Sequence, residues 1–456
     1  MDLFLLARYS TEGWESGTSG YGLPQALLLT GLSRPAGAHQ PGLSEEALMA
    51  HSDPGQFASS RDFPERTPYG EDDIAEVTAA IRSQVLFGPE GTRVRALEEG
   101  FARLYGSSHA VACTSGTAAV HTAIAALDPE PGSEIITSPV TDFGTIAGMI
   151  YQGCVPIFAD WKPGAYNLDP EDVARKITDR TAAIVPVHLF GNPCDMDAIM
   201  AIAQEHKLPV IEDCCQAYCT SYRGRYVGTV GDMGCFSMQE SKHLPAGEGG
   251  LVITNSEGLA ARMRLFRDKG WGSRGESGQR RYVLLGLNYR MNELTAAVAL
   301  VQMRKVEQVV RARNRVGDRL TELIADLPGI NPAPVTEGGS HSYWAYPIQV
   351  PGRDAEAFAR GVSAYGLWCG WGYTGKPIYL CADALCGKRT FGTSGYPFTA
   401  PPCRTTVEYA PGLCPVAERE LLETLILGPH EGWQEEDVEA AARIIRKVAA
   451  EQPCTA

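Results

Sequence analysis

The chain of 456 residues is long enough to bury a large core and to divide into more than one domain. Its hydrophobic content of 44% and charged content of 21% are ordinary for a globular protein. A net charge of −14 argues against nucleic acid as a partner, because the phosphates would be repelled. No segment approaches the roughly 20 apolar residues that a membrane helix needs. The start MDLFLLARYS also lacks the basic first residues of a signal peptide.

Thirteen cysteines, an odd number, are spread along the chain, and many lie within apolar segments, as Cys235 does. Reduced core side chains explain this distribution better than a disulfide framework, so we expect a cytoplasmic protein. Cys214, Cys215 and Cys219 are close enough in sequence to raise the question of a metal site. No second spaced pair of Cys or His accompanies them, and we therefore expect no metal.

The pattern of residue types divides the chain into three parts. Residues 1–61 are rich in Gly, Ser, Pro and His and show weak periodicity, which predicts a partly ordered N-terminal extension. Residues 62–310 are predicted to form a large domain, and residues 311–456 a smaller α+β C-terminal domain.

From about Tyr69 onward, helical and strand patterns alternate. Apolar residues at helical spacing predict helices over residues 71–83, 93–106, 116–127, 145–153, 170–178 and 195–206. Short apolar runs predict strands over residues 109–115, 133–139, 155–160, 182–190, 208–213, 234–239 and 249–255. Continuous apolar strands separated by helices are typical of an α/β fold with a mostly parallel sheet covered on both faces.

The C-terminal third begins with a long amphipathic stretch, residues 291–327, that leads out of the large domain. Further elements of the smaller domain are predicted at residues 341–350, 354–366 and 435–451. Residues 380–404 are dense in Cys, Gly, Pro and aromatic residues, and we interpret them as a loop on the substrate side.

The most informative segment is residues 208–250. The strand LPVIED ends in Asp213 and is followed by Gln216, and the next strand carries Ser237, with Lys242 five residues later. Singly, Lys242 would be a surface lysine and Asp213 a helix cap or the partner of an arginine. Together they provide a lysine that can bond a carbonyl, a carboxylate for a pyridine nitrogen and a hydroxyl for a phosphate. These are the groups that pyridoxal 5′-phosphate requires, and they make Lys242 and Asp213 the candidate catalytic residues.

A second candidate site segment is Ser115-Gly116-Thr117, which follows a predicted strand and opens a helix. Backbone N–H groups at a helix start, together with the helix dipole, suit the binding of a phosphate. Taken alone the tripeptide is a weak signal, because Ser and Thr are common helix caps.

These segments together resemble the DegT/StrS family of sugar and cyclitol aminotransferases, within the fold-type-I pyridoxal-phosphate enzymes. The family motif E-D-x-x-Q-A aligns with residues 212–217, and the family's GEGG-type turn matches residues 247–250. The resemblance runs from about Tyr69 to the C-terminus and is strongest over residues 115–255. It implies pyridoxal 5′-phosphate as cofactor and a large domain with a mostly parallel, seven-stranded-type sheet between helices.

The resemblance also implies roles for single residues. Lys242 would bond the cofactor, Asp213 would keep its pyridine nitrogen protonated, and Gln216 would hydrogen-bond its phenolic oxygen. Asn288, in the N-Y-R-M segment, would reach the phosphate of a neighbouring subunit, which implies a homodimer with shared active sites. The other expected contacts to the cofactor's phosphate come from Ser115, Gly116, Thr117 and Ser237.

Three further positions carry open alternatives. Arg290 is a candidate for the carboxylate of an amino donor, and His188 either faces the site or is a satisfied core histidine. The family stacks an aromatic side chain on the pyridine ring, but the aligned position here is Asp142. Phe143 takes this place only if the backbone is shifted by one residue.

We expect an aminotransferase that moves an amino group from L-glutamate or L-glutamine to a ketone of a sugar or cyclitol by ping-pong kinetics. Met238-Gln239 and the Cys/Gly-rich C-terminal stretch favour, by analogy, a cyclitol in antibiotic biosynthesis. One alternative is a pyridoxal-phosphate-dependent sugar dehydratase, in which a histidine replaces the lysine; the Lys242-His243 pair raises that question. The other is a regulatory homologue that has lost the chemistry.

Overall fold

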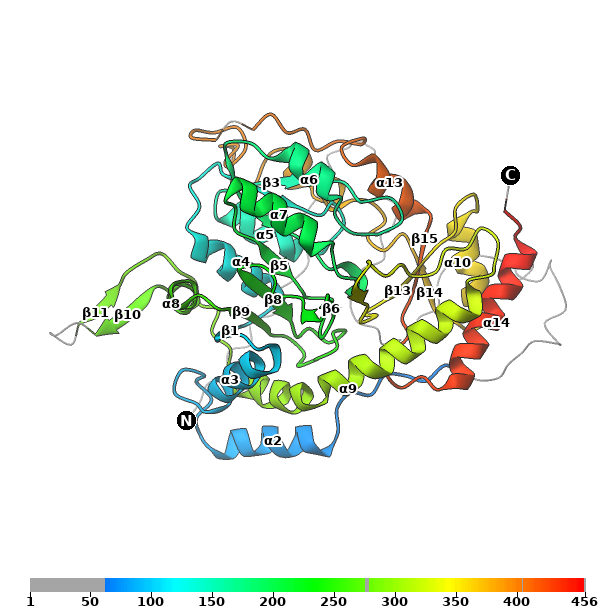
Figure 1. Ribbon diagram of the computed structural model, residues 1–456. Helices are drawn as coiled ribbons and strands as arrows, with labels where there is room; N and C mark the ends of the chain where they lie inside the picture. Colours follow the sequence, from blue (N-terminus) through cyan, green and yellow to red (C-terminus); the bar gives the residue numbers. More distant parts are fainter. Residues whose placement is uncertain (1–61, 275–278, 404, 455–456) are drawn as a thin grey trace, which may run out of the picture. The chain divides into compact units, whose positions relative to one another are not determined.

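The computed structural model describes residues 62–274, 279–403 and 405–454 (Figure 1). The predicted N-terminal extension, residues 1–61, lies outside the described residues. The helices are α2 (Glu71–Arg82), α3 (Arg93–Tyr105), α4 (Gly116–Leu127), α5 (Phe143–Tyr151), α6 (Pro170–Lys176), α7 (Met196–His206), α8 (Glu257–Phe266), α9 (Glu293–Ile324), α10 (Ala355–Ala364), α11 (Ile378–Cys381), α12 (Asp383–Cys386), α13 (Pro415–Leu422) and α14 (Glu435–Glu451).

The strands of the main sheet are β1 (His109–Cys113), β2 (Glu134–Thr137), β3 (Val155–Phe158), β4 (Thr181–Val185), β5 (Ile211–Asp213), β8 (Met233–Ser237) and β9 (Gly250–Thr254). The remaining strands are β6 (Ser221–Tyr222), β7 (Arg225–Tyr226), β10 (Trp271–Arg274), β11 (Arg280–Tyr282), β12 (Gly339–Ser340), β13 (Tyr346–Gln349), β14 (Cys369–Trp371) and β15 (Thr424–Leu427).

The main sheet is built from two ladders, β1-β9-β8-β5 and β3-β2-β4. Parallel bridges from Ile184 to Val210 and from Val187 to Asp213 join them into the order β1-β9-β8-β5-β4-β2-β3. Only β9 runs antiparallel to its neighbours, β1 and β8. The predicted α/β architecture with a mostly parallel sheet is therefore confirmed.

The main sheet is enclosed by helices, as its apolar strands require. Strands β2, β3, β8 and β9 are buried at every position. Helix α4 is apolar around most of its surface because it contacts β8 and β9 as well as α5 and α8. Helix α3 contacts β1 and α9. Its N-terminal neighbour α2 lies along α9 (Figure 1).

A smaller antiparallel sheet, β13-β15-β14, carries the second hydrophobic core. The long helix α9 runs from the first core, where it contributes Val306 and Val310, into the second, where it contributes Leu320 and Ile324 (Figure 1). Residues 378–421 return to the first core and contain the short helices α11 and α12. The domain boundary between residues 310 and 311 stays a prediction.

Several strands are shorter than predicted, and the largest difference is at β4. The strand β4 ends at Val185 and Val187 adds only a single bridge to Asp213, so the extended prediction for residues 182–190 is wrong at residues 189–190. Pro186 follows and has no N–H to continue a ladder. The chain then forms a 3₁₀ turn, Leu189–Gly191, in which Phe190 has φ 59°. This turn places Phe190 against the polar end of β5, where the candidate site lies.

Within the described part of the chain, no helix is both long enough and apolar enough to cross a membrane.

Candidate active site

The candidate site lies at one edge of the main sheet, where β1, β5 and β8 end. Gly250 pairs with Cys113 of β1 on one side and with Ser237 of β8 on the other. Asp213 pairs with Cys235, so β5 ends at the same edge. A Cβ atom on Gly250 would lie 2.2 Å from the carbonyl oxygen of Ser115, which means that only glycine allows this packing. The strand register therefore brings the predicted residues Ser115, Asp213 and Ser237 to one edge.

The start of α4 forms a cradle beside Ser237, where Gly116 has no side chain. Ser115 is the N-cap, and its Oγ accepts a hydrogen bond of 3.1 Å from the N–H of Ala118. A Cβ atom on Gly116 would lie 2.6 Å from the Cβ of Ser237 and 2.9 Å from its Oγ. The N–H groups of Gly116 and Thr117 belong to the first turn and so have no acceptor within the helix. This arrangement suits an anion beside the Ser237 hydroxyl.

Asp213 is fixed by hydrogen bonds to both of its carboxylate oxygens. It is 4% exposed, and its Oδ2 accepts a 2.8 Å hydrogen bond from the Thr145 hydroxyl. Its Oδ1 accepts a 3.1 Å bond from the N–H of Cys215. Each oxygen keeps a lone pair for a further donor. Thr145 lies in α5, and no local motif in the sequence marks it as a partner of Asp213.

Gln216 links two residues that the sequence did not associate with the site. Its Oε1 accepts a 2.8 Å bond from the N–H of Phe190, and its Nε2 donates a 3.0 Å bond to the Tyr373 hydroxyl. Tyr373 has φ 46° and packs edge-on against the Phe190 ring. Burial raises the pKa of the Tyr373 phenol, and the nearby Asp142 carboxylate adds to the effect. Tyr373 is therefore a neutral hydroxyl near the candidate catalytic groups.

Lys242 lies in the loop between β8 and β9, with its Nζ atom 3.9 Å from the centre of the Trp344 ring. Burial lowers the pKa of the Lys242 ammonium, while the carboxylates of Asp142 and Asp213 act in the opposite direction. The lowered pKa favours the neutral amine, which is the form that can attack a carbonyl.

The two alternatives for the ring-stacking position lie at the start of α5. Asp142 is the N-cap, and its Oδ1 accepts a 2.7 Å bond from the N–H of Gly144. Phe143 is the first residue of the helix and is 41% exposed. The charge of Asp142 acts on both Lys242 and Tyr373, which places its carboxylate beside the candidate site.

His188 is a satisfied core histidine. Its Nδ1 accepts a 3.0 Å bond from the N–H of Cys194, so its proton is on Nε2 and is donated to Glu212 at 3.2 Å. His188, Glu212 and Cys214 are close enough together to be compared with a metal site. Both nitrogens of His188 are already engaged, however, and burial raises the pKa of the Cys214 thiol well above its usual value. The chain's own hydrogen bonds account for this cluster.

Asn288 and Arg290 follow Lys242 by more than 40 residues in sequence, and their contacts are with residues outside the Lys242 loop. Asn288 is exposed and pairs through its backbone with Asp268. Arg290 forms an ion pair with Asp268 and lies over the Phe87 ring. Among the described residues, neither side chain hydrogen-bonds to Lys242 or Asp213.

The residues at this edge fit pyridoxal 5′-phosphate. The start of α4, where Gly116 lies beside Ser237, suits its phosphate, and the free lone pairs of Asp213 suit a protonated pyridine nitrogen. The buried amine of Lys242 suits its aldehyde carbon.

Comparison with known proteins agrees with this fit. A model of the DegT/DnrJ/EryC1/StrS aminotransferase family matches residues 68–378. The chain is 34% identical over 360 residues to the UDP-N-acetyl-3-dehydro-alpha-D-glucosamine 3-aminotransferase of Acidithiobacillus ferrooxidans, which covers 78% of this chain and 89% of the relative. It is 34% identical over 282 residues to the putative L-glutamine:3-amino-2,3-dideoxy-scyllo-inosose aminotransferase of Micromonospora echinospora, covering 61% of this chain and 67% of the relative. The solved aminotransferase from Psychrobacter cryohalolentis superposes with a TM-score of 0.75 at 28% identity, covering 86% of this chain and 99% of that one.

Because burial lowers the pKa of Lys242, its amine should react with an amine-directed reagent at lower pH than an ordinary lysine. Asp142→Asn keeps a good helix cap but removes a negative charge that opposes the shift, so the midpoint should fall further. The measurement is the pH dependence of modification in the cofactor-free protein, followed by peptide mass spectrometry. Lys447, whose pKa is raised by its bond to Glu451, is the internal control. A midpoint for Lys242 that rises or stays constant in Asp142→Asn would contradict the placement of Asp142.

Proposed function

Since the chain belongs to the DegT/DnrJ/EryC1/StrS aminotransferase family, whose enzymes depend on pyridoxal 5′-phosphate, we propose the following function. The protein transfers an amino group from L-glutamate or L-glutamine to a ketone of a sugar or cyclitol. The observation that carries the proposal is the meeting of Lys242, Asp213 and the Gly116–Ser237 cradle at one sheet edge.

Bound pyridoxal phosphate supplies a carbonyl that takes up the amino group and a ring that spreads the negative charge of a deprotonated carbon. Lys242 supplies the proton transfers. Its Nζ, when neutral, accepts the proton of the donor's α-carbon and would return it to the C4′ carbon of the cofactor. The burial that lowers the Lys242 pKa keeps this amine available as a base. In the second half-reaction the proton moves in the reverse direction, so one site serves both substrates and the kinetics are ping-pong.

Asp213 keeps the pyridine nitrogen protonated in this proposal. The Thr145 hydroxyl and the Cys215 N–H hold its carboxylate in one orientation. Gln216 donates to the cofactor's phenolic oxygen only if its Nε2 shares or leaves its bond to Tyr373. Ser115, Gly116, Thr117 and Ser237 bind the phosphate.

The names of the relatives support the substrate classes. One relative is named for a nucleotide-linked 3-dehydro sugar, and the other for L-glutamine as donor and an inosose, a keto-cyclitol, as acceptor. A role in antibiotic biosynthesis and a cytoplasmic location complete the proposal. A sugar dehydratase is less well supported, because His243 is fully buried and its Nε2 is bonded to the carbonyl of Ser342.

The active unit is proposed to be a homodimer in which Asn288 of a second copy completes the phosphate site. The chain preceding Asn288 supports this. The hairpin β10–β11 projects from the rest of the fold (Figure 1), and the end of β11 and the segment after it present apolar side chains to solvent. The exposed set is Tyr282, Val283, Leu285, which is 93% exposed, and Leu287. A second subunit would remove this apolar surface from water.

The function is tested by the visible spectrum of the purified protein. L-glutamate or L-glutamine should bleach the yellow band of the wild type. Lys242→Ala should lack the band and lose at least about 100-fold of the transamination rate, because the base is gone. Asp213→Asn should bind cofactor but lose about 10- to 100-fold, the equivalent of one charge-assisted hydrogen bond. The control is Lys447→Ala in α14, which should behave as wild type. An unchanged spectrum in Lys242→Ala would refute the role of Lys242.

Shared sites predict complementation between two inactive variants. Each proposed site takes Lys242 from one subunit and Asn288 from the other. A mixed dimer of Lys242→Ala and Asn288→Ala should therefore contain one site with both changes and one intact site. Co-purified, differently tagged subunits should regain a measurable fraction of wild-type activity. Mixed dimers that stay inactive, after mass spectrometry proves that both subunits are present, would exclude the shared site.

A further inference from the structure

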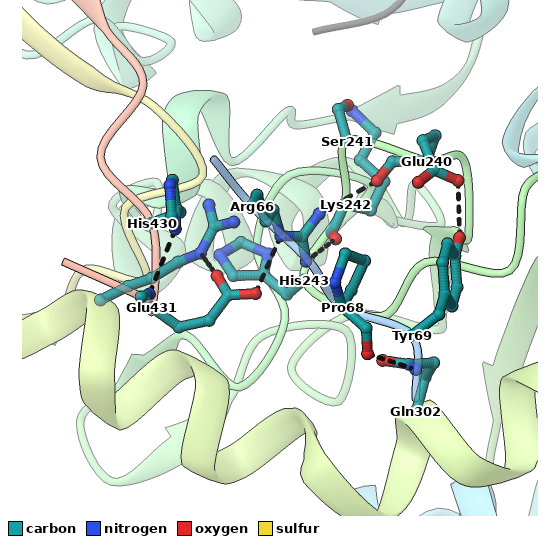
Figure 2. A network of polar contacts seen from close by, with 12 residues as sticks. Arg66, Pro68, Tyr69, Glu240, Ser241, Lys242, His243, Gln302, His430 and Glu431 are labelled. Carbon is teal, nitrogen blue, oxygen red and sulfur yellow. Dashed lines mark hydrogen bonds and ion pairs between the residues drawn. The ribbon is translucent and has the colours of Figure 1, made fainter. Parts of the chain in front are cut away.

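The segment just before α2 passes over the loop that carries Lys242. Residues 62–70, here called the strap, form neither helix nor strand. Figure 2 shows the strap between the Lys242 loop, helix α9 and residues 430–431. The mechanism above uses no residue of the strap, although its side chains are bonded directly to the loop.

Arg66 is the centre of this contact. Its Nη2 donates a 2.8 Å hydrogen bond to the carbonyl oxygen of Lys242, and its Nη1 donates a 3.0 Å bond to the carbonyl oxygen of Glu240 (Figure 2). Its Nε forms a 2.8 Å ion pair with Oε1 of Glu431. The Arg66 side chain is only 16% exposed, and its contacts with Lys242 and Glu431 are partly buried, whereas its bond to Glu240 lies at the surface. A planar guanidinium can serve three acceptors at once because its donors point in fixed directions.

Glu431 connects Arg66 to a second arginine. Its other oxygen, Oε2, accepts a 2.9 Å bond from Nε of Arg313, whose side chain is 3% exposed. Burial alone would raise the pKa of Glu431, but Arg313 and Arg66 outweigh it and hold the pKa at about 2. Glu431 is therefore ionised at any pH at which the enzyme would work.

Arg313 leads back to the side chain of Lys242. Its Nη1 donates 3.2 Å bonds to the carbonyl oxygens of Tyr343 and Trp344. The Trp344 ring lies 3.9 Å from the Lys242 Nζ, and its indole N–H donates to the carbonyl oxygen of Ser241 at 3.1 Å. Glu431 thus reaches Lys242 by two routes, one through Arg66 to the backbone and one through Arg313 and Trp344 to the amine.

The strap itself is anchored along its length. His430 and Gln302 hydrogen-bond the carbonyl oxygens of Pro64 and Pro68, at 2.8 and 3.0 Å. The Tyr69 hydroxyl donates a 2.6 Å bond to the side chain of Glu240, at the start of the same loop (Figure 2). The guanidinium of Arg66 is therefore held in place from both sides.

We propose that Arg66 and Glu431 are positioning residues for Lys242, fixing the backbone of its loop and the ring beneath its amine. The inference deepens the proposed function and rests on it, because positioning matters only if Lys242 reacts. Neither residue touches the cofactor or substrate in this account; both act through the Lys242 loop.

The first test uses the cofactor-free protein and needs no activity. The backbone bonds within the Lys242 loop include Lys242 N to Gln239 O, Glu240 N to Gly247 O, and Ala246 N to Met238 O. In Arg66→Gln and Glu431→Gln, hydrogen exchange at these amides should be about 10- to 100-fold faster, reflecting the loss of charge-assisted bonds. Arg66→Lys keeps the charge beside Glu431 but cannot reach all three acceptors, so it should give an intermediate rate and also serves if Arg66→Gln fails to fold.

The matched control is Arg319→Gln. Arg319 lies on the same helix as Arg313 and forms exposed ion pairs with Glu435 and Glu322, away from the Lys242 loop. In Arg319→Gln, the amides of the Lys242 loop should exchange at the wild-type rate.

The second test uses the cofactor-loaded enzyme. Arg66→Gln should lower kcat by about 10- to 100-fold with a much smaller change in either KM, because a misplaced base affects the reaction more than binding. The pH at which the yellow band changes should also shift, and Arg66→Lys should restore part of both effects.

Two results would overturn the inference. One is loop exchange at the wild-type rate in Arg66→Gln and Glu431→Gln. The other is a lower melting temperature with an unchanged band pH and unchanged kcat, which would assign the bridge to stability alone. If the wild type transaminates no donor, the proposed function fails, whereas the exchange measurement still decides whether Arg66 holds the loop.

Discussion

The position of Gly250 is the constraint on which the rest of the candidate site depends. Its backbone pairs with β1 on one side and β8 on the other, and there is no room for a side chain against the carbonyl of Ser115. This packing sets the start of α4 beside Ser237. Because β9 runs antiparallel between two strands that end at the same edge, the connection from β8 to β9 must turn over that edge. Lys242 lies in this turn.

The electrostatics of Lys242 reflect opposing influences. Burial favours the neutral amine, whereas Asp142, Asp213 and the face of the Trp344 ring favour the ammonium. A lysine that alternately donates and accepts a proton works best when neither its ammonium nor its neutral amine is strongly favoured. The same groups also limit where the amine can lie. The chemistry proposed for Lys242 therefore depends on residues from distant parts of the chain, including the strap.

The sequence was sufficient for the fold class and for the segments that end at the active edge, because buried strands, glycine turns and caps leave local patterns. The predicted strand at β4 was too long, because Pro186 interrupts the ladder and only Val187 pairs beyond it. The role of His188 stayed open, because it depends on hydrogen bonds to Cys194 and Glu212 that no sequence pattern indicates. Thr145, Trp344, Tyr373 and Glu431 were not found, because each reaches the site through tertiary packing and none stands in a motif. The roles of Lys242, Asp213 and Asn288 remain proposals, since they concern a bound cofactor and a second subunit.

The most direct test of this account is to reduce the purified, cofactor-loaded protein with borohydride and map the modified peptide by mass spectrometry. Borohydride makes the bond between pyridoxal phosphate and its lysine permanent, so the added mass marks the residue that carries the cofactor. The account predicts a single modified site at Lys242, and none in Lys242→Ala. A modified lysine elsewhere in the chain, or a protein that takes up cofactor without any reducible bond, would contradict it.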